Sequence, residues 1–222
     1  MSSTTGRILL RFHDALYEAY GPQGWWPGRT RTEIVVGAIL TQNTNWRNVE
    51  KAIAQLRAGG LLDWAALRDV PVADLAQHIR PAGYYRVKAR RLKNFVAWLW
   101  DVSGGDFDSL ASRPMTDLRG QLLGINGIGP ETADSILLYA LGMPTFVVDA
   151  YTGRIACRHG LIDGEVDYEA LKTLFEGHLP ADARMFNEYH ALIVAVGKRH
   201  CRPRAQCEGC PLESFEHDAA AC

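Results

Sequence analysis

The chain has 222 residues, 47% of them hydrophobic, which is enough to bury the core of one large or two small domains. No apolar run reaches the length of a membrane span, and we expect no membrane partner. The 24 Lys and Arg residues against 25 Asp and Glu give a net charge of −1, which argues against binding to polyanions by bulk charge. The first residues are polar, so we expect no secretory leader and a reducing, cytoplasmic compartment.

Helical periodicity dominates the chain. Apolar residues recur at helical spacing in residues 5–19, and Gly21-Pro22 ends that pattern. The apolar run 33–40 contains Ile34-Val35-Val36, which could form a strand, but the helical patterns on both sides favour a helix. Further helices are predicted over residues 85–102, 118–123, 131–141, 149–159, 168–177 and 184–200. No alternating pattern is long enough to build a sheet, so the sequence predicts an all-α fold.

Basic residues gather in two places that could contact a polyanion locally. Within the predicted helix 85–102 the apolar side chains form one stripe and the basic side chains the opposite face. For any single charge, the more common role is to solvate a helix face. The first cluster comprises Arg80, Arg86, Lys88, Arg90, Arg91 and Lys93, and the second comprises Lys198, Arg199, Arg202 and Arg204.

A glycine-rich turn joins the two predicted helices on either side of residues 124–130. Gly127 and Gly129 permit positive φ and a close approach of another backbone, and Pro130 suits the first turn of the next helix. Free N–H groups at such a turn can bind a phosphate oxygen, although many helix–helix turns contain glycine for other reasons. Asp149 follows an apolar run farther along, where it could be a functional acid or an N-cap.

Four of the five cysteines gather at the C-terminal end with the spacing C-x5-C-x2-C-x11-C, namely Cys201, Cys207, Cys210 and Cys222. Thiolates grouped in this way usually share a metal centre. The alternatives are disulfides or unpaired thiols, and a reducing compartment disfavours disulfides. The spacing leaves both zinc and a [4Fe–4S] cluster open. Cys157 lies far from the group in sequence and is expected in the core.

In combination, these motifs resemble the endonuclease III family of helix-hairpin-helix DNA glycosylases, and the resemblance runs from Ile34 to Cys210. It shifts the expected metal centre to a [4Fe–4S] cluster. The family's last cysteine gap is shorter and would end near Glu216, so Cys222 departs from the pattern as fourth ligand. The segments that carry the resemblance are Leu40-Thr-Gln42-Asn43, residues 80–89, 124–133 and 144–149, Asn187-Glu-Tyr-His190 and Gly197-Lys-Arg-His-Cys201.

The resemblance implies two all-α domains with a DNA-binding cleft between them. One is a helical barrel over 29–147 that holds the hairpin; the other comprises 1–28 and 148–222 and holds the cluster. The implied partner is double-stranded DNA with a damaged base, bound by a monomer that is nucleoid-associated if prokaryotic. Asp149 would stabilise the positive sugar and help activate water, and Gln42 would fill the space that a flipped base leaves. The residues implied to contact the DNA backbone are Gly127, Gly129, Arg202 and Arg204.

One departure bears on the reaction. Bifunctional relatives carry a lysine, which forms a Schiff base with the sugar, where this chain has Glu131. A carboxylate cannot form an imine, so base excision without strand cleavage is expected. As an acid assigned to the catalytic site beside Asp149, Glu131 is also expected to raise the pKa of one of the two carboxyl groups.

A narrower resemblance links the chain to the 3-methyladenine DNA glycosylase III branch, through Gly24-Trp25-Trp26-Pro27, residues 40–46 and the glutamate in the hairpin. It implies excision of alkylated purines, whose cationic ring is attracted to aromatic faces. Trp25, Trp26 and Trp46 could form such a base pocket, or simply pack in the core. Two other functions stay open: a glycosylase for oxidised pyrimidines with weak or no lyase activity, and a DNA-binding protein that excises nothing.

Overall fold

The computed structural model describes residues 4–162 and 167–221, and the chain divides into two compact units. One unit comprises Met1–Trp25 and Pro144–Cys222, and the other comprises Trp26–Met143. We call them the terminal unit and the central unit. No strand occurs in the described residues, so the all-α prediction is confirmed.

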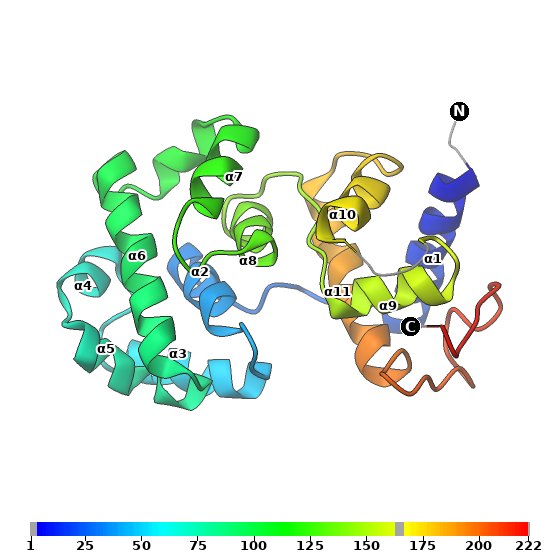
Figure 1. Ribbon diagram of the computed structural model, residues 1–222, viewed down its shortest axis with the longest axis horizontal. Helices are drawn as coiled ribbons and strands as arrows, with labels where there is room; N and C mark the ends of the chain where they lie inside the picture. Colours follow the sequence, from blue (N-terminus) through cyan, green and yellow to red (C-terminus); the bar gives the residue numbers. More distant parts are fainter. Residues whose placement is uncertain (1–3, 163–166, 222) are drawn as a thin grey trace. The chain divides into compact units, whose positions relative to one another are not determined.

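The central unit is built around one hydrophobic core. Helix α2 lies within it and packs against α3, α6, α8 and η3 (Figure 1). Because other helices surround α2, its residues 34–36 are apolar in succession without forming a strand. The elements are α2 (Arg31–Leu40), α3 (Trp46–Ala58), α4 (Trp64–Asp69), α5 (Val72–His78), η1 (Arg80–Ala82), α6 (Tyr85–Ser103), η2 (Asp108–Ser112), α7 (Met115–Leu123), α8 (Pro130–Ser135) and η3 (Ile136–Ala140).

Helices α3, α4 and α5 were not predicted from the sequence. The side chain of Asn45 caps α3 by accepting from the Asn48 N–H at 3.1 Å, and that of Asp63 caps α4 through the N–H groups of Ala65 and Ala66. Helices α4 and α5 are too short to display a full apolar period. The cap at Asp63 was the available signal for α4, whereas α5 begins after Pro71 without a side-chain cap.

The sequence indicated that the basic side chains of α6 lie on a solvated face, and Lys88 departs from this expectation. Lys88 is only 1% exposed, and its Nζ donates to the carbonyl oxygens of Leu40 at 2.9 Å and Ala82 at 2.7 Å. Burial, followed by the charge of Arg91, lowers the pKa of Lys88 to about 8. Lys93 donates to three backbone carbonyls of the α4 region. Both ammonium groups therefore satisfy carbonyls at helix ends, where the intrahelical ladder has no donor.

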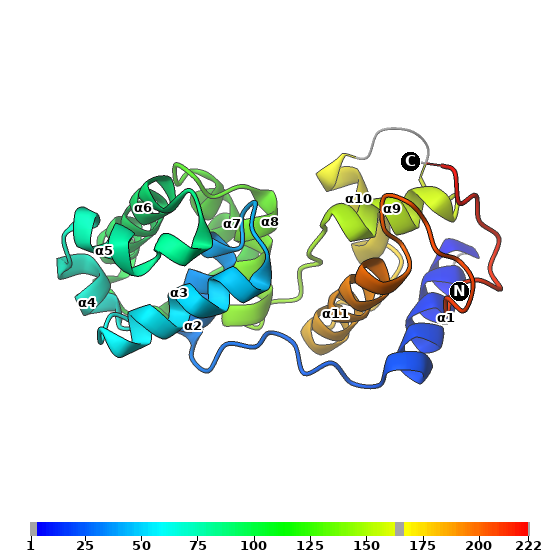
Figure 2. The ribbon, with the colours of Figure 1, turned by 90° about the horizontal axis from the view of Figure 1, so that it is seen from below.

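The terminal unit surrounds α11 (Ala183–Arg199), which packs against α1 (Thr4–Tyr20) and α9 (Ala150–Arg158), as Figure 2 shows. The hydroxyl of Tyr189 on α11 donates to the carbonyl oxygen of Leu9 on α1 at 2.8 Å. Helix α10 (Tyr168–Glu176) packs against α9. After α11, the described chain to residue 221 follows loops and turns.

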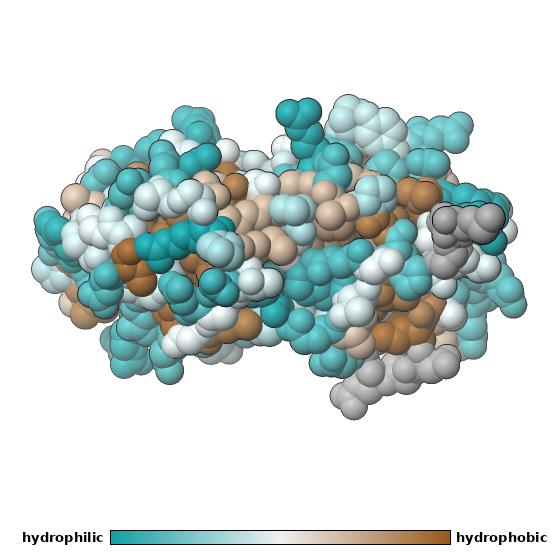
Figure 3. Space-filling model, turned by 90° about the horizontal axis from the view of Figure 1, so that it is seen from above, coloured by the Kyte–Doolittle hydropathy of each residue, from teal (hydrophilic) through white to brown (hydrophobic). Residues whose placement is uncertain are grey.

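Hydrophilic and hydrophobic residues are interspersed on the surface seen in Figure 3. Few large hydrophobic side chains of the described residues are strongly exposed, and the most exposed is Tyr84 at 72%. Among the described helices, none combines the length and the apolar character needed to cross a membrane.

Candidate active site and DNA interface

Helices α7 and α8 and the turn between them form a helix-hairpin-helix. Ile125 and Ile128 anchor the turn in the core, being 7% and 5% exposed, and the Ile128 N–H donates to the Ile125 carbonyl at 3.0 Å. A two-pronged ion pair joins the helices: Arg119 Nε lies 2.8 Å from Asp134 Oδ1 and Arg119 Nη2 lies 3.0 Å from Oδ2. Asp134 is fully buried, so this pair holds the hairpin in one geometry.

Gln42, just after α2, lies against this hairpin. Its Nε2 donates to the Gly127 carbonyl at 3.1 Å and to Thr132 Oγ1 at 2.9 Å, and its Oε1 accepts from Arg91 Nη1. Gly127 has a φ of 97°, a left-handed conformation that glycine adopts without strain. The structure thus brings together Gln42 and Gly127, both predicted to contact DNA, and adds Arg91, which the sequence indicated only as part of a basic cluster.

Asp149 is the N-cap of α9. Its Oδ1 accepts from the backbone N–H groups of Tyr151 at 2.9 Å and Thr152 at 2.8 Å, and from Thr152 Oγ1 at 3.0 Å. Thr152 Oγ1 in turn accepts from the Asp149 N–H at 3.3 Å, which completes a capping box. The N-cap role that the sequence left open is therefore observed for Oδ1 of Asp149, whereas Oδ2 makes none of these capping bonds.

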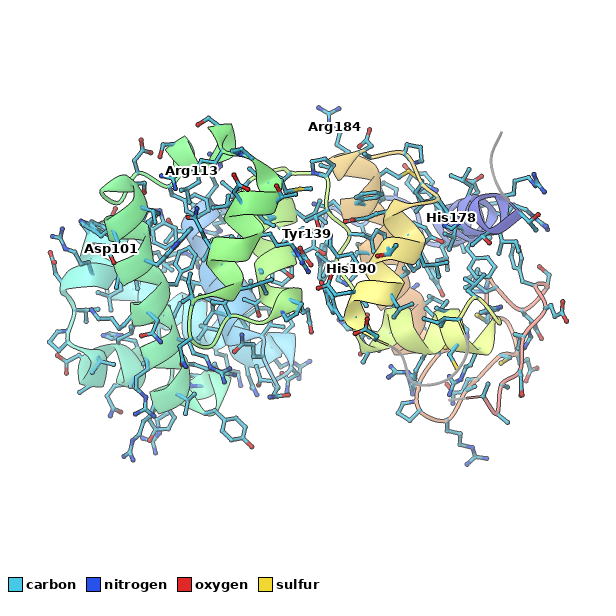
Figure 4. The ribbon with its side chains drawn as sticks, turned by 45° about the horizontal axis from the view of Figure 1, so that its top comes forward. Asp101, Arg113, Tyr139, His178, Arg184 and His190 are labelled. Carbon is cyan, nitrogen blue, oxygen red and sulfur yellow. The ribbon has the colours of Figure 1, made fainter. Side chains whose placement is uncertain are left out.

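Oδ2 of Asp149 lies 3.6 Å from Nε2 of His190, which projects from α11 (Figure 4). Burial alone would raise the pKa of Asp149, but the nearby imidazole of His190 and the bonds from Thr152 outweigh it and hold the pKa below its ordinary value. The expected pKa rise from Glu131 therefore does not apply to Asp149. His190 occurred in the sequence motif, but only the fold placed it against the carboxylate.

Helix α10 fixes the extended segment that leads to Asp149. Glu176 Oε1 accepts from the Phe146 N–H at 2.7 Å and from Thr145 Oγ1 at 3.1 Å, and the buried Lys172 donates to both Glu176 Oε1 and Thr145 Oγ1. Phe146 itself is fully buried and stacks on Phe175, with ring centroids 4.2 Å apart. The backbone before Asp149 is thereby held by charge-assisted bonds and by packing.

An aromatic cluster of Trp26, Trp46 and Tyr139 lies in the central unit. The Trp26 ring stacks on Tyr139 with centroids 5.0 Å apart and meets Trp46 edge-on at 5.1 Å. Gly37 of α2 leaves room for both indoles, because a Cβ there would lie 3.3 Å from each. Tyr139, labelled in Figure 4, belongs to η3, a π-helical stretch of the kind often found at functional sites. The sequence did not single it out, since an aromatic in an apolar helix is typical of a core residue.

The site residues assigned from the sequence also include Trp25 and Glu131. Trp25 belongs to the terminal unit, where Lys198 Nζ lies 6.0 Å from its ring centroid. Glu131 belongs to the central unit and is an exposed residue in the first turn of α8, next to Pro130. Asp149, the other acid assigned to the catalytic site from the sequence, belongs to the terminal unit.

The cysteine loop follows α11. Cys201, Cys207 and Cys210 are half-buried and line one small cavity. Burial raises the pKa of Cys210, and the nearby Cys201 and Cys207 raise it further. Arg202 and Arg204 are exposed on the same loop, and Arg202 Nε donates to the Lys198 carbonyl at 2.7 Å.

Arg158 of α9 ties this loop to the helix that Asp149 caps. It is 4% exposed, and its Nη1 lies 3.2 Å from Cys201 Sγ and 2.8 Å from the Arg202 carbonyl, while its Nη2 lies 2.8 Å from the Pro203 carbonyl. A guanidinium in this position stabilises a thiolate.

Three thiols surround one cavity, and the Arg158 guanidinium lies beside one of them. The chemistry of these groups fits a thiolate-ligated metal centre. In residues 4–162 and 167–221, no group of three or more His, Cys, Asp or Glu side chains has the arrangement of a metal site. The fourth ligand predicted from the sequence, Cys222, lies outside the described residues.

Comparison with known proteins identifies the family. The sequence pattern of the HhH-GPD superfamily, described as base excision DNA repair proteins, matches residues 36–181, which include α7, α8 and Asp149. The chain belongs to this superfamily. It is a DNA glycosylase of the HhH-GPD base excision repair family.

Similar proteins span almost the whole chain. A provisionally named DNA repair glycosylase of Methanocaldococcus jannaschii is 45% identical over 216 residues, covering 97% of this chain and 98% of the relative. The structure of the H. pylori 3-methyladenine DNA glycosylase bound to 1,N6-ethenoadenine has a TM-score of 0.75 at 27% identity and covers 88% of this chain and 97% of that one. A non-covalent endonuclease III–DNA complex has a TM-score of 0.81 at 22% identity, with 98% and 97% covered, and shares the fold.

Proposed function

We propose that this HhH-GPD glycosylase is a monofunctional enzyme that excises alkylated purines such as 3-methyladenine from duplex DNA. The observation that carries the proposal is the cluster of Trp26, Trp46 and Tyr139, whose π faces suit a flipped, cationic base. Trp25 is included in the proposed base pocket by its place in the Gly-Trp-Trp-Pro motif. The similarity to the H. pylori enzyme, which holds an ethenoadenine, supports a purine substrate.

Asp149 is the proposed catalytic residue. Its lowered pKa keeps the carboxylate ionised at neutral pH, which suits stabilisation of the positive charge that develops on the sugar as the glycosidic bond breaks. Oδ1 is held by the cap of α9, so the carboxylate has a fixed orientation. An ionised carboxylate can also accept a proton from the attacking water.

Glu131 supports the monofunctional assignment. Its carboxylate has no amine to attack the sugar C1′, so base release leaves an abasic site in an uncut strand. Glu131 is an exposed residue in the first turn of α8, the second helix of the helix-hairpin-helix.

The proposed DNA contacts come from three places. The hairpin residues Gly127 and Gly129 present backbone N–H groups to a phosphate, and Gln42 fills the space left by the flipped base. Arg202 and Arg204, exposed on the cysteine loop, bind the DNA backbone. With a net charge of −1, such local contacts have to provide the electrostatic attraction, and the enzyme acts as a monomer.

The cysteine loop is proposed to hold a [4Fe–4S] cluster through Cys201, Cys207, Cys210 and Cys222. When bound, the cluster ties the loop covalently and has no part in base chemistry. Arg158 holds the loop by its bonds to Cys201 Sγ and to two carbonyls, and so keeps Arg202 and Arg204 in place.

A panel of single-lesion duplexes tests the function. Base release from 3-methyladenine or ethenoadenine duplexes, with strand breakage only after alkali, is the expected result. Trp46→Leu should reduce this release at least tenfold, whereas Trp100→Leu, a control on α6 whose ring contacts Arg68, should not. Preferential release of oxidised pyrimidines would overturn the substrate assignment, and binding without release of any base would identify a non-catalytic protein.

A further inference from the structure

In the DNA-free protein every polar atom of the Gln42 side chain is engaged. Nε2 donates its two hydrogens to the Gly127 carbonyl and to Thr132 Oγ1, and Oε1 accepts from Arg91. Thr132 is only 5% exposed, so these bonds are partly shielded from water. The amide that is proposed to enter the duplex is thus bound to its own protein.

Arg91 crosses the hairpin to reach Gln42. A side chain at Gly127 would overlap the aliphatic part of Arg91, so the absence of a Cβ there is required for the crossing as well as for the positive φ. Asn94, one turn further along α6, donates its Nδ2 to the Asn126 carbonyl at 3.0 Å. The same helix therefore supports the hairpin and orients the Gln42 amide.

We propose that Arg91 is a positioning residue that holds Gln42 against the hairpin until a duplex offers a space for the amide to enter. This inference rests on the proposed role of Gln42 in filling the duplex. On an intact duplex the amide has no space to enter, so the bond from Arg91 to Oε1 is kept. Insertion of Gln42 into the space vacated by a flipped base breaks this bond, which therefore opposes insertion.

The arrangement makes insertion of Gln42 depend on the state of the duplex. Docking of the hairpin on an intact duplex leaves the amide bound to the protein, and only a duplex with an empty space offsets the loss of these bonds. Since insertion breaks bonds within the protein, Gln42 enters an intact base stack less readily than a free glutamine would.

The test compares binding to a duplex carrying a tetrahydrofuran abasic analogue with binding to the same duplex intact. Arg91→Met removes the guanidinium and keeps the aliphatic stem; Arg90→Met, on an exposed neighbour, removes the same charge. Both variants should bind all DNA more weakly. Only Arg91→Met should raise the ratio of abasic to intact affinity, by about tenfold, the size expected for one charge-assisted hydrogen bond.

Two further variants locate the effect. In a Gln42→Ala background, Arg91→Met should leave the ratio unchanged, because no amide is there to be released. Thr132→Val removes the acceptor on the other side of the amide and should raise the ratio by a smaller factor, which provides the test if Arg91→Met does not fold. The proposal is overturned if the ratio of abasic to intact affinity stays constant or falls in both Arg91→Met and Thr132→Val. It is also overturned if Arg91→Met raises this ratio equally in the Gln42→Ala background.

A second readout separates this inference from the proposed function. The side-chain NH₂ resonances of Gln42 report its hydrogen bonds without any base release, and they should shift toward those of a free glutamine in Arg91→Met. If the protein excises no base but Arg91→Met shifts the Gln42 resonances and raises the affinity ratio, the proposed function fails and the role of Arg91 stands. If the protein releases bases but Arg91→Met changes neither the resonances nor the ratio, the proposed function stands and the role of Arg91 is overturned.

Discussion

Oδ2 of Asp149 lies 3.6 Å from Nε2 of His190, while Oδ1 is bound by the first turn of α9. The carboxylate is therefore held between a helix N-terminus and an imidazole. Both favour its ionised form, which offsets the effect of burial and lowers the pKa of Asp149. One residue thus serves as a cap through one oxygen and presents charge through the other.

Asp149→Asn should reduce single-turnover base release by at least a thousandfold, with lesion-duplex affinity within a few fold of wild type. Asparagine caps helices about as well as aspartate, so the fold and the docking surface persist while the charge is lost. Asp182→Asn is the matched control, because Asp182 caps α11 through the N–H groups of Arg184 and Met185. Near-normal activity of Asp149→Asn would leave Asp149 with a capping role only.

The rate of base release should not depend on Asp149 titration between pH 5 and 8. The folded-state pKa lies below the value of about 3.9 for an unperturbed aspartate, so the carboxylate stays ionised until the solution is more acidic than that. By linkage, the stability that this shift contributes is present above the unfolded pKa and is lost as the pH falls through the folded pKa.

His190→Phe provides the corresponding test of cause. Without the imidazole, burial should raise the pKa of Asp149, and the acid limb of the single-turnover rate should move to higher pH. Rates measured from pH 4.5 to 8, with circular dichroism confirming the fold at each pH, would detect the shift. An unmoved acid limb would show that His190 does not control this ionisation.

The wild-type protein should form no borohydride-trapped adduct with DNA, and its product strand should break only on alkali treatment. Glu131→Lys supplies an amine and should give a trapped adduct, whereas Glu131→Gln, which only neutralises the charge, should not. Adduct formation by wild type would mean that another amine attacks the sugar. Failure of Glu131→Lys alone would place Glu131 outside the reach of C1′.

The purified protein should be brown and contain about four irons per chain. Cys207→Ser should lose most of this iron, and Cys222→Ser should lose less if another group replaces the distant ligand. Stoichiometric zinc without visible absorbance would contradict the cluster assignment, and equal iron loss in Cys207→Ser and Cys222→Ser would make Cys222 a full ligand.

Lys88→Met should destabilise the fold by about 1–3 kcal/mol for each of the two carbonyls left without a donor, those of Leu40 and Ala82. The pKa of Lys88 is lowered to about 8, so its charged form is disfavoured in the folded protein. Stability should therefore rise relative to Lys88→Met as the pH increases from about 8 towards the unfolded-state value of about 10.4. Urea unfolding across this range measures both effects, with exposed Arg86→Met as control.

The family and most of the helices could be predicted because they depend on local order in the sequence. The glycine turn reflects a backbone conformation that glycine adopts without strain. The apolar run before Asp149 and the amphipathic stripes reflect segments that pack in the core. Helices α4 and α5 were missed because they are short and depend on packing. Helix α3 was missed although Val49, Ala52, Ile53 and Leu56 recur at helical spacing, a pattern that could have predicted it.

The sequence by itself determined which residues are proposed to carry the chemistry: Asp149, the hairpin, Glu131 in place of lysine, and the cysteine group. Only the tertiary structure decided their partners. Spacing within one helix does not reveal that Lys88 is buried, that His190 of α11 approaches Asp149, or that Arg91 reaches Gln42 across Gly127. These contacts join residues far apart in the chain, and their energy comes from burial and desolvation that exist only once the helices have packed.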